Sequence, residues 1–364
     1  MRPQQVPPQS SQDSPRYAER SPLLDRCDGA ASRPQSGDAR VKSAVEEVYR
    51  AESPEKLRAS GIDVFLGSTR FLDDHIIETG GETLTGRRFF IATGARPAIP
   101  PISGIDDVDF LTHETLPDLE ELPRRFIVIG GGPIGCEMAR AFCRLGSNVT
   151  LLEAGPRILP QEEPEAGGLI PSRLMDDGVD LRLNVMVDRL WQNGDTIHVG
   201  MDGQELEGDA LLVAVGRRPM LDDLELDKAG VVYSPSGIQV NSRMRTNRGH
   251  IYAAGDCAGG YQFTHYAAWQ GFMAVRNAYV PLNDAGVLDL VPWSTFTDPE
   301  VAHTRLTEAQ ARSKFGQGVL VCNWPVEKVD RALTDGDATG FVKLIHKATG
   351  PFWALPWPLF GPGR

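Results

Sequence analysis

The chain has 364 residues, which is enough for two or three domains with cores of their own. Its formal net charge of -12 at pH 7 argues against nucleic acid or an anionic membrane surface as its main partner. The apolar runs are short, and the first forty residues lack the apolar segment of a secretory signal, so neither a membrane span nor export is predicted.

The five cysteines show no pattern typical of disulfides or metal sites; they are Cys27, Cys136, Cys143, Cys257 and Cys322. No two of them form a CxxC pair, so we expect reduced thiols and a cytoplasmic location. Cys136 and Cys143 share one face of a predicted helix, where thiols of the hydrophobic core are favoured over a metal or redox pair. We therefore predict no metal site.

The first forty residues are rich in Pro, Gln and Ser and show no apolar periodicity, which predicts a disordered tail over 1–40. A helical pattern follows over 41–58, and the run IDVFL over 62–66 predicts a short strand. Residues 68–88 predict an antiparallel meander whose turns contain the dipeptides DD and GG.

The apolar run over 89–92 predicts a strand that ends at Thr93 and Gly94. A small hydroxyl residue and a glycine at the carboxyl end of a strand leave room for a dinucleotide that crosses the sheet edge. The run LLVAVGRRP over 211–219 ends in a similar way, so two strands point to the same kind of ligand.

A third strand of this kind is HIYAAGDCAGG, over 250–260. Gly255 would permit close approach of a ligand to the backbone, and Asp256 would offer a carboxylate to a polyol hydroxyl. The alternative for Asp256 is a helix cap or an Asx turn that binds no ligand.

Between these strands, RRFIVIGGGPIGCEMARAF predicts a strand, a glycine-rich turn and a helix. Gly130, Gly132 and Gly135 form a GxGxxG pattern. Gly130 permits a tight turn, Gly132 lets a pyrophosphate approach the backbone, and Gly135 lets the helix pack closely on the strand. The pattern predicts a dinucleotide site; the alternative is a turn that binds nothing.

A second strand over 148–152 leads to Glu153. A carboxylate in this place can accept a hydrogen bond from a ribose hydroxyl and repels a 2′-phosphate, so it favours NADH over NADPH. Arg157 is close in the sequence and weakens that preference. The next helix should contain GG at 167–168 and Pro171, and is expected to be short or broken.

These motifs occur in one order: ATGARP, GGGPIGCE, the strand before Glu153, VGRRP and YAAGDCAGG. In this order they resemble the pyridine nucleotide-disulfide oxidoreductase family, which includes dihydrolipoamide dehydrogenases and mercuric reductases. Downstream, VPWSTFTDPEVAHTRLTEAQAR resembles the start of the dimerisation domain of that family, in its mercuric-reductase-like branch. The resemblance covers about Val41 to Gly350.

The resemblance implies an α/β fold with two Rossmann-like nucleotide-binding domains, one of which interrupts the other, and a partial α+β dimerisation domain. The implied divisions are a disordered tail at 1–40, a partial FAD-binding domain at 41–122 and 247–290, an NAD(P)-binding domain at 123–246, a partial dimerisation domain at 291–350 and an irregular tail at 351–364.

The resemblance also implies residues that bind each cofactor. For NAD(P)H these are Gly130, Gly132, Pro133, Ile134, Gly135 and Glu153, with Gly216 near the nicotinamide. For FAD they are Thr93, Gly94, Gly255, Asp256, Gln262, Phe263, Thr264 and His265. His265 would begin a helix whose N-terminal amides stabilise charge on the reduced flavin; the alternative is a helix-start residue without a special role.

Some family features are missing from the sequence. Members of the family begin with another GxGxxG and a redox-active CxxxxC, and this sequence has neither, so no catalytic residue is assigned. Glu137 pairs in the family with a lysine after that dithiol, and is expected to lack a cation here. After Gly350, PFWALPWPLFGPGR shows no strand pattern; it is either a docking segment or the sign of truncation or a changed reading frame, and it would weaken a homodimer.

Two functions remain open at this point. The first is a flavin-dependent oxidoreductase that transfers hydride from NAD(P)H to FAD and electrons onward to a disulfide, a metal or another unknown acceptor. The second is a non-catalytic NAD-binding remnant or regulatory partner that does not retain FAD.

Overall fold

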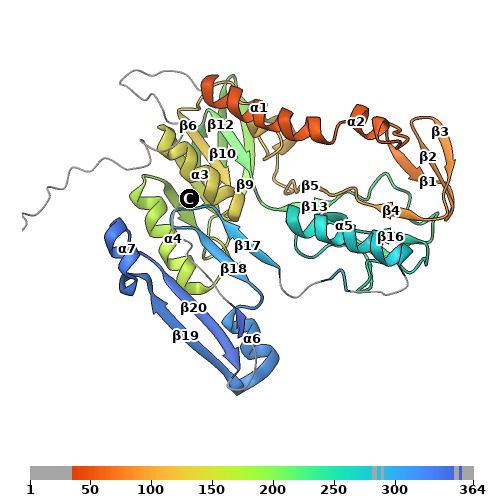
Figure 1. Ribbon diagram of the computed structural model, residues 1–364. Helices are drawn as coiled ribbons and strands as arrows, with labels where there is room; N and C mark the ends of the chain where they lie inside the picture. The colour runs from red at the N-terminus through yellow and green to blue at the C-terminus, as the bar shows by residue number, and fades with distance from the viewer. Residues whose placement is uncertain (1–34, 281–284, 288–290, 348–351, 355–364) are drawn as a thin grey trace, which may run out of the picture. The chain divides into compact units, whose positions relative to one another are not determined.

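The computed structural model describes residues 35–280, 285–287, 291–347 and 352–354 (Figure 1). The chain divides into two units, of which the first is Met1–Asp63 with Pro117–Leu122 and the second is Val64–Leu116 with Pro123–Arg364. Among the helices in these described ranges, none combines the length and the apolar character needed to cross a membrane.

The first unit contains helices α1, Gln35–Ala51, and α2, Pro54–Ala59, which confirm the helical pattern predicted over 41–58. Ser53 caps α2 by accepting a hydrogen bond from the backbone N–H of Lys56. The prediction of disorder over 1–40 is wrong for residues 35–40, which belong to α1. A helix that has nucleated adds further residues at little cost in free energy. Residues 1–34 lie outside the described residues.

The strand predicted over 62–66 is also wrong. These residues belong to no strand, and Leu66 has 66% of its surface exposed. An apolar run becomes a strand only where a neighbouring strand pairs with it, and no such pairing is seen here within the described part of the chain.

The second unit is built on a four-stranded parallel sheet in the order β12–β6–β7–β8. The strands are Ala210–Val213, Arg125–Ile129, Asn148–Glu153 and Asp180–Leu183. Helices α3, Pro133–Leu145, and α4, Pro164–Asp176, lie side by side over one face (Figure 1). Phe126 and Val128 of β6 pack against this helical layer.

An antiparallel meander packs on the other face of the parallel sheet. Its strands are β9, Val187–Asn193, β10, Thr196–Met201, and β11, Gln204–Gly208. Ile127 and Ile129 of β6 point toward it and contact a core that includes Leu190 and Val199. The alternation of side chains along β6 therefore buries both faces of the sheet, as an apolar parallel strand requires.

Helix α4 is continuous, which contradicts the prediction that it is short or broken. Pro171 lies inside it, yet Ile170 and Leu174 are fully buried against the sheet and Ala166 is nearly so. These three residues repeat at a spacing of four and share one face. The burial of that face stabilises the helix more than its glycines and proline destabilise it.

The remaining strands before residue 280 form small sheets. The meander predicted over 68–88 is confirmed as β1, Thr69–Phe71, β2, Ile76–Thr79, and β3, Glu82–Thr85. The other pairs are parallel β4, Phe89–Ile91, with β16, Ile251–Ala253; antiparallel β5, Ala95–Pro97, with β13, Arg217–Pro219; and antiparallel β14, Tyr233–Ser234, with β15, Gly237–Ile238. Helix α5, Thr264–Tyr279, follows.

The last part of the unit is named here the interface segment, residues 291–347 with 352–354. Its elements are β17, Pro292–Thr295, β18, Val301–Thr304, α6, Glu308–Phe315, β19, Val319–Pro325, α7, Asp330–Asp335, β20, Phe341–Lys347, and β21, Phe352–Ala354. Strand β21 pairs with β20, although no strand was predicted after Gly350. The backbone groups along β20 make this pairing available to a short segment without an alternating pattern.

Candidate functional site

The glycine-rich turn joins the end of β6 to the start of α3. Gly130 has a φ of +112°, and a Cβ atom on it would collide with the backbone of Ala214. A Cβ atom on Gly135 would overlap the carbonyl oxygen of Gly130. Both positions therefore require glycine, Gly130 for its positive φ and its approach to Ala214, and Gly135 for the close packing of the helix against the turn.

Gly132 is different, because a Cβ atom built on it meets nothing within 4 Å. It is the N-cap of α3, and no side chain caps the 13-residue helix. The positive end of the helix dipole therefore lies beside open space at Gly132, with no side-chain cap on the first turn. This is the arrangement that binds a phosphate group.

Glu153 lies at the end of β7, against this turn. Its Oε2 accepts a hydrogen bond of 2.6 Å from the N–H of Gly131, and its Oε1 accepts one of 2.7 Å from the N–H of Gly155. Each carboxylate oxygen can accept more than one hydrogen bond, so the group keeps capacity for a ribose hydroxyl.

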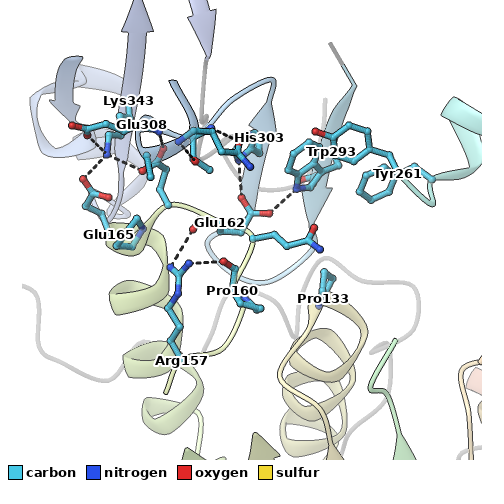
Figure 2. A pocket seen from close by; sticks show the side chains of 18 of the residues that line it. Pro133, Arg157, Pro160, Glu162, Glu165, Tyr261, Trp293, His303, Glu308 and Lys343 are labelled. Atoms are coloured by element: carbon cyan, nitrogen blue, oxygen red, sulfur yellow. Dashed lines mark hydrogen bonds and ion pairs between the residues drawn. The ribbon is translucent and has the colours of Figure 1, made fainter. Parts of the chain in front are cut away.

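Arg157, which was expected to weaken the preference for NADH, is held by the backbone. Its guanidinium donates to the carbonyl oxygen of Glu162 at 3.1 Å and to that of Pro160 (Figure 2). The side chain therefore forms part of the loop before α4.

A cavity of about 1280 Å³ connects the start of α3 to the interface segment. Several predicted site residues lie together in its wall: Pro133, Ile134, Gly216, Gln262 and Phe263. Motifs separated by more than a hundred residues thus meet at one cavity, large enough for a cofactor-sized ligand.

Sequence reasoning missed an aromatic wall on the same cavity. The indole N–H of Trp293 donates to Oε1 of Glu162 at 2.6 Å, and Nδ1 of His303 lies 3.1 Å from Oε2 of the same carboxylate (Figure 2). The rings of Trp293 and His303 stack with centroids 4.2 Å apart, and Tyr261 lies 5.2 Å from Trp293. Glu162 is 4% exposed, so its two partners replace the water it has lost.

Glu137 of α3 also lines the cavity. Its Oε1 accepts a hydrogen bond of 2.8 Å from the N–H of Phe296, and within the described ranges no cation forms an ion pair with it. Burial raises the pKa of Glu137, and the hydrogen bond from Phe296 lowers it by a smaller amount. The hydrogen bond from Phe296 therefore supplies only part of the stabilisation that a lysine would give to the ionised carboxylate of Glu137.

The residues predicted for FAD lie at the ends of β4 and β16. Because these strands are parallel neighbours, Thr93 and Gly94 reach the same edge as Gly255 and Asp256. The hydroxyl of Thr93 donates to the carbonyl oxygen of Met220 at 2.8 Å. Figure 1 shows the two strands beside each other. The structure thus brings the predicted residues together.

The carboxylate of Asp256 is already engaged. Its Oδ2 lies 3.0 Å from Nη1 of Arg217, and the residue is 7% exposed. A polyol hydroxyl would have to share or displace this ion pair.

The segment before α5 places two more predicted residues. Thr264 is the first residue of the helix, one position before His265, where the helix was predicted to begin. Nε2 of His265 lies 2.8 Å from the carbonyl oxygen of Pro292, to which it donates, so the ring joins α5 to β17.

Three thiols that are buried or partly buried are poor nucleophiles. Burial raises the pKa of Cys136, of Cys143 and of Cys257. A thiol must ionise before it attacks a disulfide. None of these three is therefore suited to a thiol exchange step.

Comparisons with known proteins agree with this geometry. The family model described as pyridine nucleotide-disulphide oxidoreductase matches residues 14–271, and the model for the dimerisation domain of that family matches residues 291–351. The mercuric reductase of Bacillus cereus is 38% identical over 293 residues, which are 79% of this chain and 46% of that protein. The dihydrolipoyl dehydrogenase of Bacillus subtilis (strain 168) is 36% identical over 299 residues, 79% of this chain and 64% of that protein.

Solved structures give the same result. The HOCl-induced flavoprotein disulfide reductase RclA from Escherichia coli matches with a TM-score of 0.79 and 31% identity, over 89% of this chain and 76% of that one. LpdA from Mycobacterium tuberculosis matches with a TM-score of 0.81 and 27% identity, over 94% of this chain and 77% of that one. The predicted α/β class is confirmed. The chain spans about half the length of the mercuric reductases of Bacillus cereus and Lysinibacillus sphaericus, 46% and 56% respectively.

Proposed function

The chain belongs to the pyridine nucleotide-disulphide oxidoreductase family, and we propose that it is a flavin-dependent oxidoreductase that binds NADH on the turn from Gly130 to Gly135. The amides at the start of α3 would bind the pyrophosphate, and Glu153 would accept a hydrogen bond from the ribose. Gly216 would lie near the nicotinamide, since it lines the same cavity.

The observation that carries this proposal is the open space beside Gly132. A pyrophosphate needs close contact with backbone amides, and at Gly132 no protein atom fills the place of a side chain. Gly130 and Gly135 are required by the fold itself, so their presence is weaker evidence for a ligand.

Substitution of Gly132 tests the nicotinamide site. Gly132→Val should abolish NADH binding, because the added side chain would occupy the space of the phosphates while leaving the protein packing intact. Gly318→Val is a matched control, since a Cβ atom there also meets nothing within 4 Å and its backbone is not left-handed. NADH fluorescence titration measures both; unchanged affinity in Gly132→Val would refute the assignment.

For FAD, the residues of this chain would be Thr93, Gly94, Gly255 and Asp256, with the run from Gln262 to His265 along the ring. FAD, when bound, would supply the two-electron acceptor for the hydride of NADH. The residues of this chain would hold its polyol, orient the nicotinamide and exclude water. The acceptor of the electrons after FAD is not assigned.

A second function is favoured by the ion pair between Asp256 and Arg217. Within the described ranges, β4 and β16 form a parallel sheet of only two strands, and its acidic residue is already paired. A chain with this sheet could bind the nicotinamide dinucleotide without retaining FAD, as a non-catalytic NAD-binding protein or regulatory partner.

The visible absorbance spectrum of the purified protein separates the two functions. Flavin bands that bleach when NADH is added would support the oxidoreductase. A colourless protein that binds NADH but does not take up added FAD would support the NAD-binding protein.

The match to a dimerisation domain supports a homodimer through the interface segment as part of the same proposal. A cytoplasmic location is proposed as well, because the four cysteines in the described part of the chain are free thiols.

A further inference from the structure

Three groups of side chains in the described residues have ligand atoms close enough together to hold a metal ion. Two of them are occupied by other protein groups. Nζ of Lys343 lies among Glu163, Glu165 and Glu308, within 2.9 Å of each. In the second group, Asn193 engages Nε2 of His198 and Arg125 pairs with Glu207.

The third group consists of Asp74, His75 and His250, and one ligand atom of each lies within 4.8 Å of the others. Asp74 and His75 lie in the turn between β1 and β2, and His250 directly precedes β16. The group is remote in sequence from the dinucleotide turn and belongs to no cofactor site described above.

Backbone carbonyls determine the tautomer of both histidines. Nδ1 of His75 lies 2.9 Å from the carbonyl oxygen of Gly86, and Nε2 of His250 lies 2.6 Å from that of Asp74. A carbonyl oxygen only accepts, so each of these nitrogens carries the proton. The other nitrogen of each ring, Nε2 of His75 and Nδ1 of His250, is left with a lone pair.

A histidine that donates one ring N–H to a backbone carbonyl while its other nitrogen is free has the arrangement typical of metal ligands. The carboxylate of Asp74 supplies an oxygen donor beside the two nitrogens. We propose that Asp74, His75 and His250 bind a divalent transition ion of the zinc class, with water completing the coordination.

The stack of the two rings determines how the ion enters. Their centroids are 4.1 Å apart and their planes differ by 5°, whereas a metal lies in the plane of each imidazole that binds it. Binding therefore requires one ring to turn out of the stack. His75 is exposed and can turn, which would release its hydrogen bond to Gly86. His250 is partly buried beside Phe89 and would keep its hydrogen bond to Asp74. The bound ion would tie the β1–β2 turn to the start of β16.

Titration of the untagged full chain with Zn²⁺ alone tests the proposal, with calorimetry as the readout. We expect one ion per chain. His75→Gln and Asp74→Asn should each weaken Zn²⁺ binding by at least about tenfold, because each removes a ligand. His198→Gln is the matched control, a histidine of an occupied group, and should bind Zn²⁺ as the unmodified chain does.

Electron paramagnetic resonance of the Cu²⁺-loaded chain provides a second readout. We expect hyperfine splitting from two coordinated nitrogens in the unmodified chain and from one in His75→Gln. His75 is exposed, so this variant should fold normally, and thermal melting without metal checks that it does. Equal Zn²⁺ affinity in the unmodified chain and in His75→Gln, or a Cu²⁺ spectrum without nitrogen splitting, would overturn the proposal.

Discussion

The backbone N–H of Gly131 donates a hydrogen bond of 2.6 Å to Oε2 of Glu153, 22 positions further along the chain. The carboxylate that is proposed to bind the ribose therefore also supports the turn that is proposed to bind the pyrophosphate. A single side chain thus couples two parts of one ligand site, because its two oxygens face different backbone groups.

Glu153→Gln should reduce the preference for NADH over NADPH by about fivefold. The amide oxygen of glutamine can still accept from Gly131, although its NH2 group cannot accept from Gly155. The substitution removes the negative charge that repels a 2′-phosphate, a repulsion of about 1 kcal/mol for two charges 4 Å apart in water. Fluorescence titrations with both dinucleotides measure the change. An unaltered ratio of the two affinities would show that Glu153 does not face the 2′ position.

Lys343→Met should destabilise the protein by about 3–5 kcal/mol at pH 7, because it leaves the carboxylate of Glu163, a buried group, without its cation. Urea unfolding at equilibrium measures this loss. Arg331→Met is a suitable control, since its ion pair with Asp335 is exposed and should contribute about 0–1 kcal/mol.

The effect of Lys343→Met should also depend on pH. Hydrogen bonds from Lys343 and Arg312 lower the pKa of Glu308 in the folded state. A lowered pKa contributes stability that is present above the unfolded value of about 4.3 and is lost as the pH falls through the folded value. The difference in unfolding free energy between the variant and the unmodified chain should therefore shrink as the pH falls below about 4. A difference that stays constant down to pH 3 would contradict this.

Glu137→Gln should stabilise the protein at neutral pH. Burial raises the folded-state pKa of Glu137, so its ionised form is less favourable in the folded chain than in the unfolded chain. That cost is present at high pH and disappears as the pH falls below the unfolded value, where the carboxyl is protonated in both states. Glutamine can still accept from the N–H of Phe296. Thermal melting at pH 7 and at pH 3 should show a gain only at pH 7.

Cys322 should react with iodoacetamide in the native protein much faster than Cys136 or Cys257. It is exposed, whereas burial shields the other two and raises their pKa. Mass spectrometry of peptides after timed alkylation measures each rate. Rapid alkylation of Cys136 without unfolding would mean that α3 opens in solution.

Local patterns predicted the central sheet well. The apolar runs that became β6 and β7, and the glycines that start α3, are recognisable because strand burial and turn geometry depend on neighbouring residues. Helix α4 could not be predicted in the same way, since the burial of Ile170 and Leu174 against the sheet overrides its own composition. Strand β21 depends on its pairing with β20.

The sequence by itself determined the glycine-rich turn and the strand ends that are proposed to face the cofactors, because the positive φ of Gly130 and the contact of Gly135 with Gly130 are set within a few residues. Only the tertiary structure decided what surrounds that turn. Trp293 and Glu162 are 131 positions apart and meet through one hydrogen bond, and Asp74 meets His250 across 176. Such contacts leave no local pattern, since they depend on how layers pack and not on the period of any one segment.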